Sequence, residues 1–239
     1  MSALRDKVIV VTGASTGIGR TLALQLIAAG ATVIATARSA DKLEALAAEG
    51  GARLIGVQSD VSDPASVQRL AETTQARCGA VDAVVNNAGI GYLEPFVNST
   101  VEHWRETIET NLFGALRTMQ AFLPSMVQRG RGVIINVGSN GASGWPYLTL
   151  YAASKAALEA ATLAIDREHC ESGVRILSID IGPTRGTEFG SRFTNADTLA
   201  CATDTWTRLG IQWSNFVTKE TTAKRIMAVL EEHLSAPAG

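Results

Sequence analysis

The sequence predicts an α/β fold, in which one doubly wound parallel sheet carries helices on both of its faces. Short apolar runs alternate along the chain with longer amphipathic stretches, which is the pattern of repeated βαβ units. The apolar runs show little apolar–polar alternation, as expected of parallel strands that are buried on both faces. The sequence contains no internal repeats and no Pro- or Ser-rich linkers, so residues 1–239 are predicted to form a single domain.

Six apolar runs are predicted to be the strands of this sheet. Most are rich in Val and Ile, whose branched side chains pack well on a pleated surface. In chain order the runs are Val8–Val11, Thr32–Thr36, Arg53–Ser59, Val81–Val85, Val133–Val137 and Val174–Ile181.

Amphipathic stretches between and after these runs are predicted to be helices. One of them begins at Asp63-Pro64, where Asp is a favourable N-cap and Pro fits the first helical position. Pro124 is expected to kink or restart a long helix near its end, because proline lacks the backbone N–H that a helix interior uses. The other predicted helices are Ile18–Ala29, Asp41–Ala48, Val101–Gln128, Tyr151–Glu171 and Lys219–His233.

Composition and charge exclude several classes of partner. Hydrophobic residues make up 46% of the chain and charged residues 18%, which is the balance of a soluble globular protein. The formal net charge of −2 offers no basic field for nucleic acid or anionic lipid. Because no apolar run is long enough for a signal peptide or a membrane span, we expect a cytoplasmic protein. Cysteine and histidine show no metal-ligand spacing, so no metal site is expected.

A glycine-rich turn links the first predicted strand to the first predicted helix. Gly13 permits the tight turn, Gly17 lets the backbone approach a pyrophosphate, and Gly19 lets helix and strand pack closely. The helix N-terminus then presents free N–H groups to the phosphates. Such turns also occur as simple connectors, but the strand–turn–helix context favours a dinucleotide. The residues predicted to bind the cofactor here are Gly13, Ser15, Thr16, Gly17, Ile18 and Gly19.

The residues after the second and third strands indicate which dinucleotide is bound. An acidic residue after the second strand would bind the ribose 2′-hydroxyl of NAD, but the sequence has Arg38, which can pair with a 2′-phosphate. The predicted cofactor is therefore NADP(H), with NAD(H) less favoured, although Arg38 could instead be a solvated loop charge. Asp60 and Val61 are placed to touch the adenine, and Asp60 could equally be a helix-entry residue.

A tyrosine and a lysine are predicted to form a proton-transfer group. Tyr151 and Lys155 lie four residues apart, so a helix places them on one face. A nearby ammonium favours the phenolate and is expected to lower the tyrosine pKa. Ser139, just past the fifth strand, can hydrogen-bond a substrate oxygen. Tyr147 is a weaker candidate, because it lies eight residues from Lys155 and follows Pro146.

Taken together, these motifs resemble those of the short-chain dehydrogenase/reductase family, over most of the chain. The resemblance implies a Rossmann sheet in which Tyr151 is the general acid/base and Lys155 holds the nicotinamide ribose and tunes the tyrosine. It further implies that Ser139 polarises the carbonyl and that Asn111 holds a water in a proton relay. The matching motifs are Thr12–Gly19, Asp60, Asn86–Gly89, Asn111, Ser139, and Tyr151 with Lys155.

The resemblance also implies further cofactor contacts. Asn87, Ala88 and Gly89 would stabilise the central strand and touch the cofactor, and Gly182 would lie near the nicotinamide carboxamide. The chain departs from the family where Pro-Gly often follows the sixth strand, because it has Gly182-Pro183 there. It also has Thr16 where many members have a basic residue. The NADP preference consequently depends mainly on Arg38.

A polar segment with scattered tryptophans, Thr184–Val217, interrupts the α/β pattern. A long segment without clear strands is typical of a lid or binding loop, although it could be a plain surface insertion. Nearby aromatic side chains indicate apolar or aromatic substrate contacts, unless they simply pack the lid. These aromatics are Trp145, Tyr147, Phe189, Phe193 and Trp206.

Three functions remain open from the sequence. The leading hypothesis is a carbonyl reductase that uses NADPH to reduce a ketone or aldehyde. The second is a catalytically silent NADP-binding sensor or partner protein, which would have no need of Tyr151 and Lys155. The third is an isomerase or epimerase, for which the chain is short. A homo-oligomer is expected, with a dimer through the two long helices favoured.

Overall fold

The computed structural model describes residues 2–235 and has a six-stranded parallel sheet at its centre. The strand order is β3-β2-β1-β4-β5-β6, so the direction of winding reverses between β1 and β4. All neighbouring strands pair in parallel. The strands are β1 (Val8–Thr12), β2 (Thr32–Ala37), β3 (Leu54–Gln58), β4 (Ala83–Asn86), β5 (Gly132–Val137) and β6 (Val174–Ile179). The predicted doubly wound fold is confirmed, and the six predicted strands shift by at most two residues at either end.

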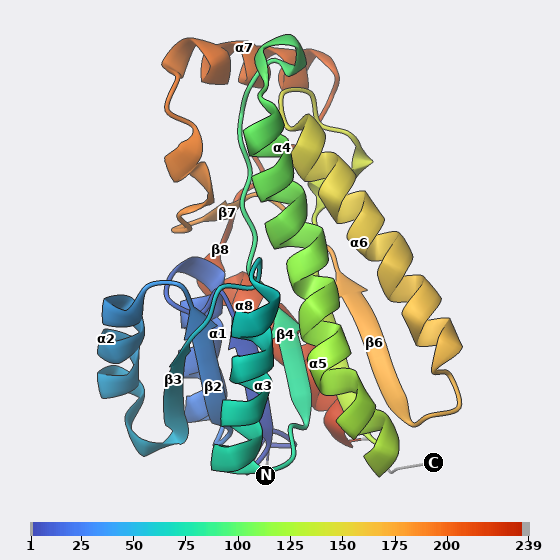
Figure 1. Cartoon of the computed structure of the whole chain (residues 1–239). Helices are drawn as coiled ribbons and strands as arrows, with labels where there is room; N and C mark the ends of the chain where they lie inside the picture. Colours follow the sequence, from blue (N-terminus) through green and yellow to red (C-terminus); the bar gives the residue numbers. More distant parts are fainter. Residues whose placement is uncertain (1, 236–239) are drawn as a thin grey trace.

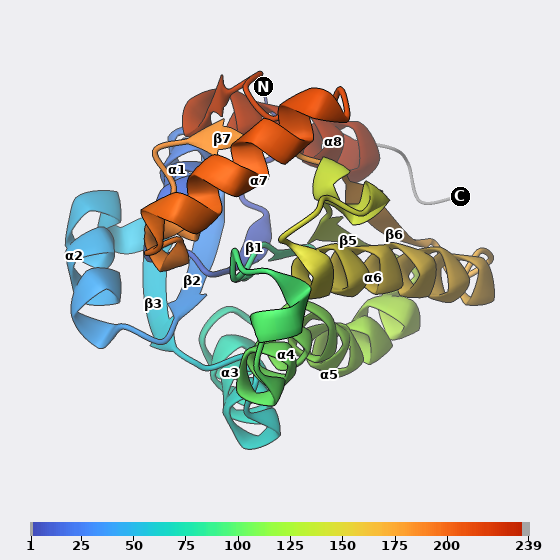
Figure 2. The same ribbon diagram turned by 90° about the horizontal axis from the view of Figure 1, so that it is seen from above.

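Helices cover both faces of the sheet, as Figures 1 and 2 show. One face packs against α1 (Gly17–Ala28), α2 (Ala40–Gly50) and α8 (Lys219–Ser235). The other face packs against α3 (Pro64–Cys78), α5 (Gly114–Arg129) and α6 (Thr149–Glu168). Each face has its own apolar core, because the sheet's side chains alternate between the two.

The long helix predicted over Val101–Gln128 is divided, but not where the sequence suggested. It consists of α4 (Val101–Ile108), a π-helical turn (Glu109–Phe113) and α5. Pro124 lies inside α5, which continues to Arg129, so the helix does not restart at Pro124, and the alternative of a kink there stays a prediction. The irregularity is instead at the π-helical turn. This wider turn holds about one residue more than an α-helical turn, so the side chains after it point in a different direction.

The lid segment, Thr184–Val217, has more regular structure than the predicted loop. It contains α7 (Ala196–Arg208), a 3-10 turn (Phe189–Arg192) and the strand β7 (Thr184–Arg185), which pairs with β8 (Val217–Thr218). Figures 1 and 2 show α7 lying across the carboxyl ends of the strands. The buried residues of α7, Ala202 and Trp206, pack with Leu93, Trp145 and Leu148 in a third apolar cluster. The lid therefore packs on its own small core, separate from the two cores of the sheet.

Candidate active site

A cavity of about 1330 Å³ lies at the carboxyl ends of the strands, beneath the lid segment. Ligands of doubly wound sheets bind at this edge, where the winding reverses. Nearly every site residue predicted from the sequence lines the cavity; Gly19 and Asn111 do not. The predicted residues in its wall are Gly13, Ser15, Thr16, Gly17, Ile18, Arg38, Asp60, Val61, Asn87, Ala88, Gly89, Ser139, Tyr151, Lys155 and Gly182.

The turn after β1 is held close to the turn after β4. The backbone of Gly13 has φ +63°, and a Cβ atom there would lie 2.9 Å from the Cα atom of Ala88. The Thr12 hydroxyl accepts hydrogen bonds from the backbone N–H groups of Asn87 and Ala88, both at 3.0 Å, and the Asn87 amide donates to the Thr12 carbonyl at 2.9 Å. Glycine at position 13 is thus required by both the backbone angle and the space.

The N-terminus of α1 opens into the cavity without a side-chain cap. Its N-cap residue, Thr16, makes no capping hydrogen bond, and the first turn contains no acidic residue. The first N–H groups of a helix have no partner within the helix, so they are available here to an anion. Gly17, the first residue of α1, has φ +54°, a backbone angle that favours glycine.

Gly19 has a packing role, because it lies behind the turn and does not line the cavity. A Cβ atom on Gly19 would collide with the Gly13 carbonyl oxygen and with the Asn87 side chain. The predicted close approach of helix and strand is therefore present at this glycine. Its predicted contact with the cofactor stays a prediction.

Two charged residues mark the end of the cavity beside β2 and β3. Arg38 is exposed, and residues 2–235 provide no ion-pair partner for its guanidinium. Asp60 accepts hydrogen bonds from the backbone N–H and the hydroxyl of Ser62, at 2.9 and 2.7 Å. Asp60 consequently shapes the turn before α3 while it lines the cavity. Lys42, which the sequence reasoning did not select, also lines this end.

Tyr151 lies at the opposite end of the cavity and is partly buried. Burial raises the pKa of its phenol to about 12; the neighbouring Ser139 hydroxyl opposes this shift and the Asp180 carboxylate adds to it. The sequence reasoning expected Lys155 to lower this pKa. In the structure the loss of solvation outweighs any such effect, so the phenol is protonated at neutral pH.

Lys155 is 4% exposed and lies one helical turn from Tyr151 on α6. Its Nζ atom donates a hydrogen bond of 2.7 Å to the Val137 carbonyl and lies 5.9 Å from the centre of the Tyr151 ring. Burial lowers the pKa of Lys155 to about 8, and the Asp180 carboxylate acts in the opposite direction. Lys155 therefore keeps its charge at pH 7 but loses it in mildly alkaline solution.

Asn111 lies in the π-helical turn, and its side chain binds the chain segment just after β4. Its Oδ1 atom accepts from the Ile90 backbone N–H at 2.8 Å, and its Nδ2 atom donates to the Ile90 carbonyl at 2.8 Å and to the Ser154 hydroxyl at 3.0 Å. These contacts occupy the Asn111 side chain, and the role in a proton relay that the resemblance implies for Asn111 stays a prediction.

Aromatic side chains of the lid segment close the cavity over Tyr151. The Phe189 ring lies 4.8 Å from the Tyr151 ring, centre to centre, and it fits there because residue 91 is glycine. A Cβ atom on Gly91 would lie 2.8 Å from the Phe189 ring. The Trp206 indole N–H anchors α7 by donating to the Pro146 carbonyl at 2.8 Å. No pattern in the sequence predicts this close approach of the Phe189 ring to Gly91.

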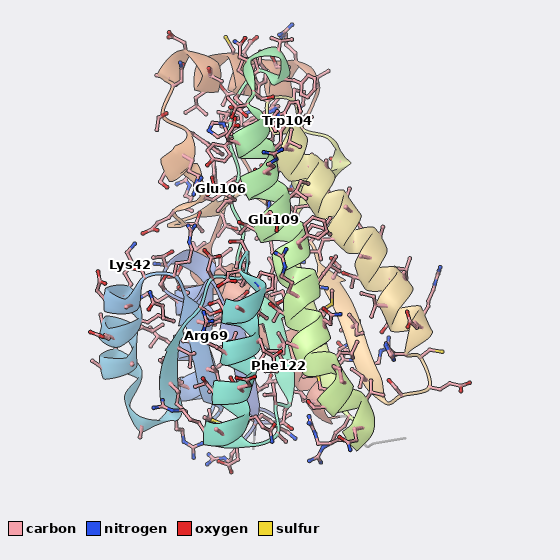
Figure 3. The ribbon with its side chains drawn as sticks, viewed as in Figure 1. Lys42, Arg69, Trp104, Glu106, Glu109 and Phe122 are labelled. Carbon is pink, nitrogen blue, oxygen red and sulfur yellow. The ribbon has the colours of Figure 1, made fainter. Side chains whose placement is uncertain are left out.

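An ion pair joins the lid segment to α4. The Arg192 guanidinium donates two hydrogen bonds to the Glu106 carboxylate, at 2.9 and 3.1 Å, and a third to the Tyr92 hydroxyl. It also lies over the Tyr92 ring, 4.8 Å from the ring centre. Glu106, labelled in Figure 3, lies on the side of α4 that faces the lid segment. Arg192 lines the cavity, but its charge is matched by this carboxylate.

Within residues 2–235, no group of three or more metal-binding side chains is found, and no helix is long and apolar enough to cross a membrane.

Comparisons with known proteins give a consistent result. The family model described as short chain dehydrogenase matches residues 7–197. The NADP-dependent 3-hydroxy acid dehydrogenase YdfG of Salmonella typhi is 38% identical over 197 residues, which is 81% of this chain and 79% of that protein. The protein of the same name from Escherichia coli (strain K12) is 36% identical over 194 residues, 80% of this chain and 78% of the other.

Solved structures are similar over nearly the whole chain. A closed form of serine dehydrogenase complexed with NADP+ has a TM-score of 0.82 and 33% identity, and the match covers 97% of this chain and 90% of that one. An alcohol dehydrogenase from the archaeon Thermococcus sibiricus, complexed with 5-hydroxy-NADP, has a TM-score of 0.80 and 29% identity, with 98% and 92% covered.

Proposed function

The chain belongs to the short-chain dehydrogenase family, and on this premise we propose that it is an oxidoreductase that uses NADPH to reduce a ketone or aldehyde. The observation that carries the proposal is that a single cavity is lined by both groups of predicted site residues. At one end are the glycine turn and Arg38, and at the other end Tyr151, Lys155 and Ser139. The bound coenzyme would supply the hydride, and the chain's own residues would supply binding, orientation and the proton.

The residues present fit an NADP-type dinucleotide. The uncapped N-terminus of α1 suits a pyrophosphate. The guanidinium of Arg38, which has no ion-pair partner among residues 2–235, suits a 2′-phosphate. The volume of about 1330 Å³ exceeds the 300–1,000 Å³ typical of drug-sized ligands, so a dinucleotide and a small substrate can share the cavity. Two of the similar proteins named above are described as NADP-dependent, and two similar structures contain NADP or a derivative.

Reduction of a carbonyl requires a proton donor beside the carbonyl oxygen. A phenol whose pKa is about 12 is protonated at pH 7, which is the form that can donate a proton to a carbonyl oxygen. We assign that step to Tyr151, with Ser139 hydrogen-bonded to the same oxygen. Lys155, anchored on the Val137 carbonyl, would hold the ribose and place its ammonium near the phenolate that proton donation leaves.

The lid segment supports an apolar or aromatic substrate. The cavity wall beyond Tyr151 is formed largely by Trp145, Leu148, Phe193 and Trp206. A 3-hydroxy acid, or the corresponding 3-oxo acid, is the second candidate, because similar proteins carry that name and because Arg192 lines the cavity. Because the Glu106 carboxylate already pairs with the Arg192 guanidinium, Arg192 is a weaker anchor for a substrate carboxylate.

A panel of carbonyl compounds tests the proposal. Apolar aromatic ketones and aldehydes should oxidise NADPH faster than 3-oxo acids do, as followed by the loss of NADPH absorbance. The reverse order of rates would favour the 3-hydroxy acid assignment. No turnover with any compound, together with tight NADPH binding, would support a silent NADP-binding protein.

The Tyr151→Phe variant tests the mechanism. It should bind NADPH with unchanged affinity, because only the phenolic hydroxyl group is lost. It should reduce carbonyls at least about a hundred-fold more slowly, because the proton donor is missing. Binding is measured by NADPH fluorescence and turnover by NADPH absorbance. Retention of normal turnover would exclude Tyr151 as the proton donor.

We also propose a cytoplasmic homodimer that associates through the long helices. Cys78, Cys170 and Cys201 are free thiols, as is usual in a reducing compartment. Three large apolar side chains are exposed along these helices: Val101, 44% exposed at the start of α4, Phe113, 42% exposed in the π-helical turn, and Leu163, 50% exposed on α6.

A further inference from the structure

Lys42 is a second cation at the end of the cavity where Arg38 lies. It belongs to the first turn of α2, four residues after Arg38, and both side chains line the cavity. Figure 3 shows Lys42 at the end of α2 that faces the lid segment. Its ammonium pairs there with the lid residue Glu188, at an Nζ–Oε1 distance of 2.8 Å.

The Lys42–Glu188 pair differs from the ion pair that joins the lid segment to α4. Arg192 binds Glu106 through two hydrogen bonds and is additionally held by Tyr92. Lys42 and Glu188 share one hydrogen bond, and their side chains are 48% and 59% exposed. An ion pair this exposed changes an equilibrium constant by no more than about five-fold. The partner of Lys42 is therefore easily exchanged.

We propose that Lys42 is a second ligand of the coenzyme's 2′-phosphate, and that this phosphate replaces Glu188 as its partner. The inference rests on the proposed use of NADP(H). A phosphate monoester carries a charge of about −1.5 to −2 at pH 7, against −1 for a carboxylate. It can also contact Arg38, which has no ion-pair partner within residues 2–235. The phosphate therefore competes successfully for the Lys42 ammonium.

Glu188 becomes a specificity-determining residue under this arrangement. A dinucleotide without the 2′-phosphate leaves the Lys42–Glu188 pair in place and gains nothing from Lys42. A dinucleotide with the phosphate gains Lys42 but must first displace Glu188. Removal of the Glu188 charge should consequently strengthen binding of the phosphorylated ligand, and it should do so only while Lys42 is present.

A double-mutant cycle tests the exchange without any need for turnover. Calorimetry would compare 2′,5′-ADP, which carries the 2′-phosphate, with 5′-AMP, which lacks it. The Lys42→Met variant should bind 2′,5′-ADP about ten-fold more weakly, the effect of losing one charge-assisted hydrogen bond, and should bind 5′-AMP normally. The Glu188→Gln variant should bind 2′,5′-ADP about two- to five-fold more tightly. In the Lys42→Met background, Glu188→Gln should have no effect.

The Lys224→Met variant is the matched control, because it removes the same charge from the exposed side of α8, outside the cavity. An equal loss of affinity in that variant would show an effect of net charge and overturn the inference. The inference would also be overturned if the Lys42→Met variant bound 2′,5′-ADP with unchanged affinity, or if Glu188→Gln still tightened binding in the Lys42→Met background. If the wild type bound neither NADPH nor 2′,5′-ADP, the proposed function would fail as well; normal NADPH binding with an unaffected Lys42→Met variant overturns this inference alone.

Discussion

At the scale of single residues, burial sets the charge of the two groups beside the proposed substrate position. It acts in opposite directions on them, because the phenol of Tyr151 is neutral when protonated and the amine of Lys155 is neutral when deprotonated. The pKa of Tyr151 rises to about 12 and that of Lys155 falls to about 8. The first group to change its charge as the pH rises above neutrality is therefore the lysine.

The pH dependence of the reaction follows from this order. The value of kcat/KM for NADPH, which reports groups of the free enzyme, should fall as the pH passes through about 8, because Lys155 loses its ammonium there. The Lys155→Arg variant, whose guanidinium stays charged, should lose this descending limb even if its maximal rate is lower. A wild-type profile that stays flat to pH 10 would contradict the assignment.

At the scale of elements, Asn111 ties the π-helical turn to the chain after β4. Its side chain makes three hydrogen bonds, two of them to the backbone of Ile90, and Asn111 is 1% exposed. The Asn111→Ala variant should be less stable by about 3 kcal/mol, because buried backbone groups lose their partners. The measurement is urea unfolding.

The Ser154→Ala variant provides the comparison for this prediction. It removes one of the three hydrogen bonds of the Asn111 side chain, together with the hydroxyl's own bond to the Tyr151 carbonyl, so it should cost about 1 to 2 kcal/mol. Equal losses in the two variants would mean that the Ile90 contacts contribute little, and that the π-helical turn is held by packing alone.

The elements that the sequence predicted are those whose signal is local. Continuous apolar runs identified the six strands, and the spacing of Tyr151 and Lys155 placed both on one helix. The helix α7 was missed because its sequence is rich in Thr, which favours helices weakly, and only Ala202 and Trp206 are buried. The π-helical turn was missed because the amphipathic pattern continues across it.

Contacts between distant parts of the chain were beyond the reach of sequence patterns. Lys42 and Glu188 are 146 residues apart, and Glu106 and Arg192 are 86 residues apart. Each of these side chains alone reads as an ordinary solvated charge. Only the fold brings them together, because the lid segment returns over α2 and α4.

At the scale of the whole molecule, the lid segment is attached at separate places. Its helix packs through Trp206 on the loop before α6, Arg192 binds α4, and Glu188 binds α2. The attachment through Trp206 is largely apolar, whereas the other two are ionic. We infer that raised salt concentration, which screens exposed ion pairs, weakens the attachments through Glu188 and Arg192 before it weakens the attachment through Trp206.

The proposed dimer gives the last prediction at this scale. A large apolar side chain that is half exposed on a long helix is stabilised when a second copy covers it. The Leu163→Glu variant should therefore run as a monomer in light scattering after size exclusion, while the wild type runs as a dimer. Leu209→Glu is the control, because Leu209 is 62% exposed at the end of α7, away from the long helices. A monomeric wild type, or a Leu163→Glu variant that keeps the dimer mass, would place the subunit contact elsewhere or remove it.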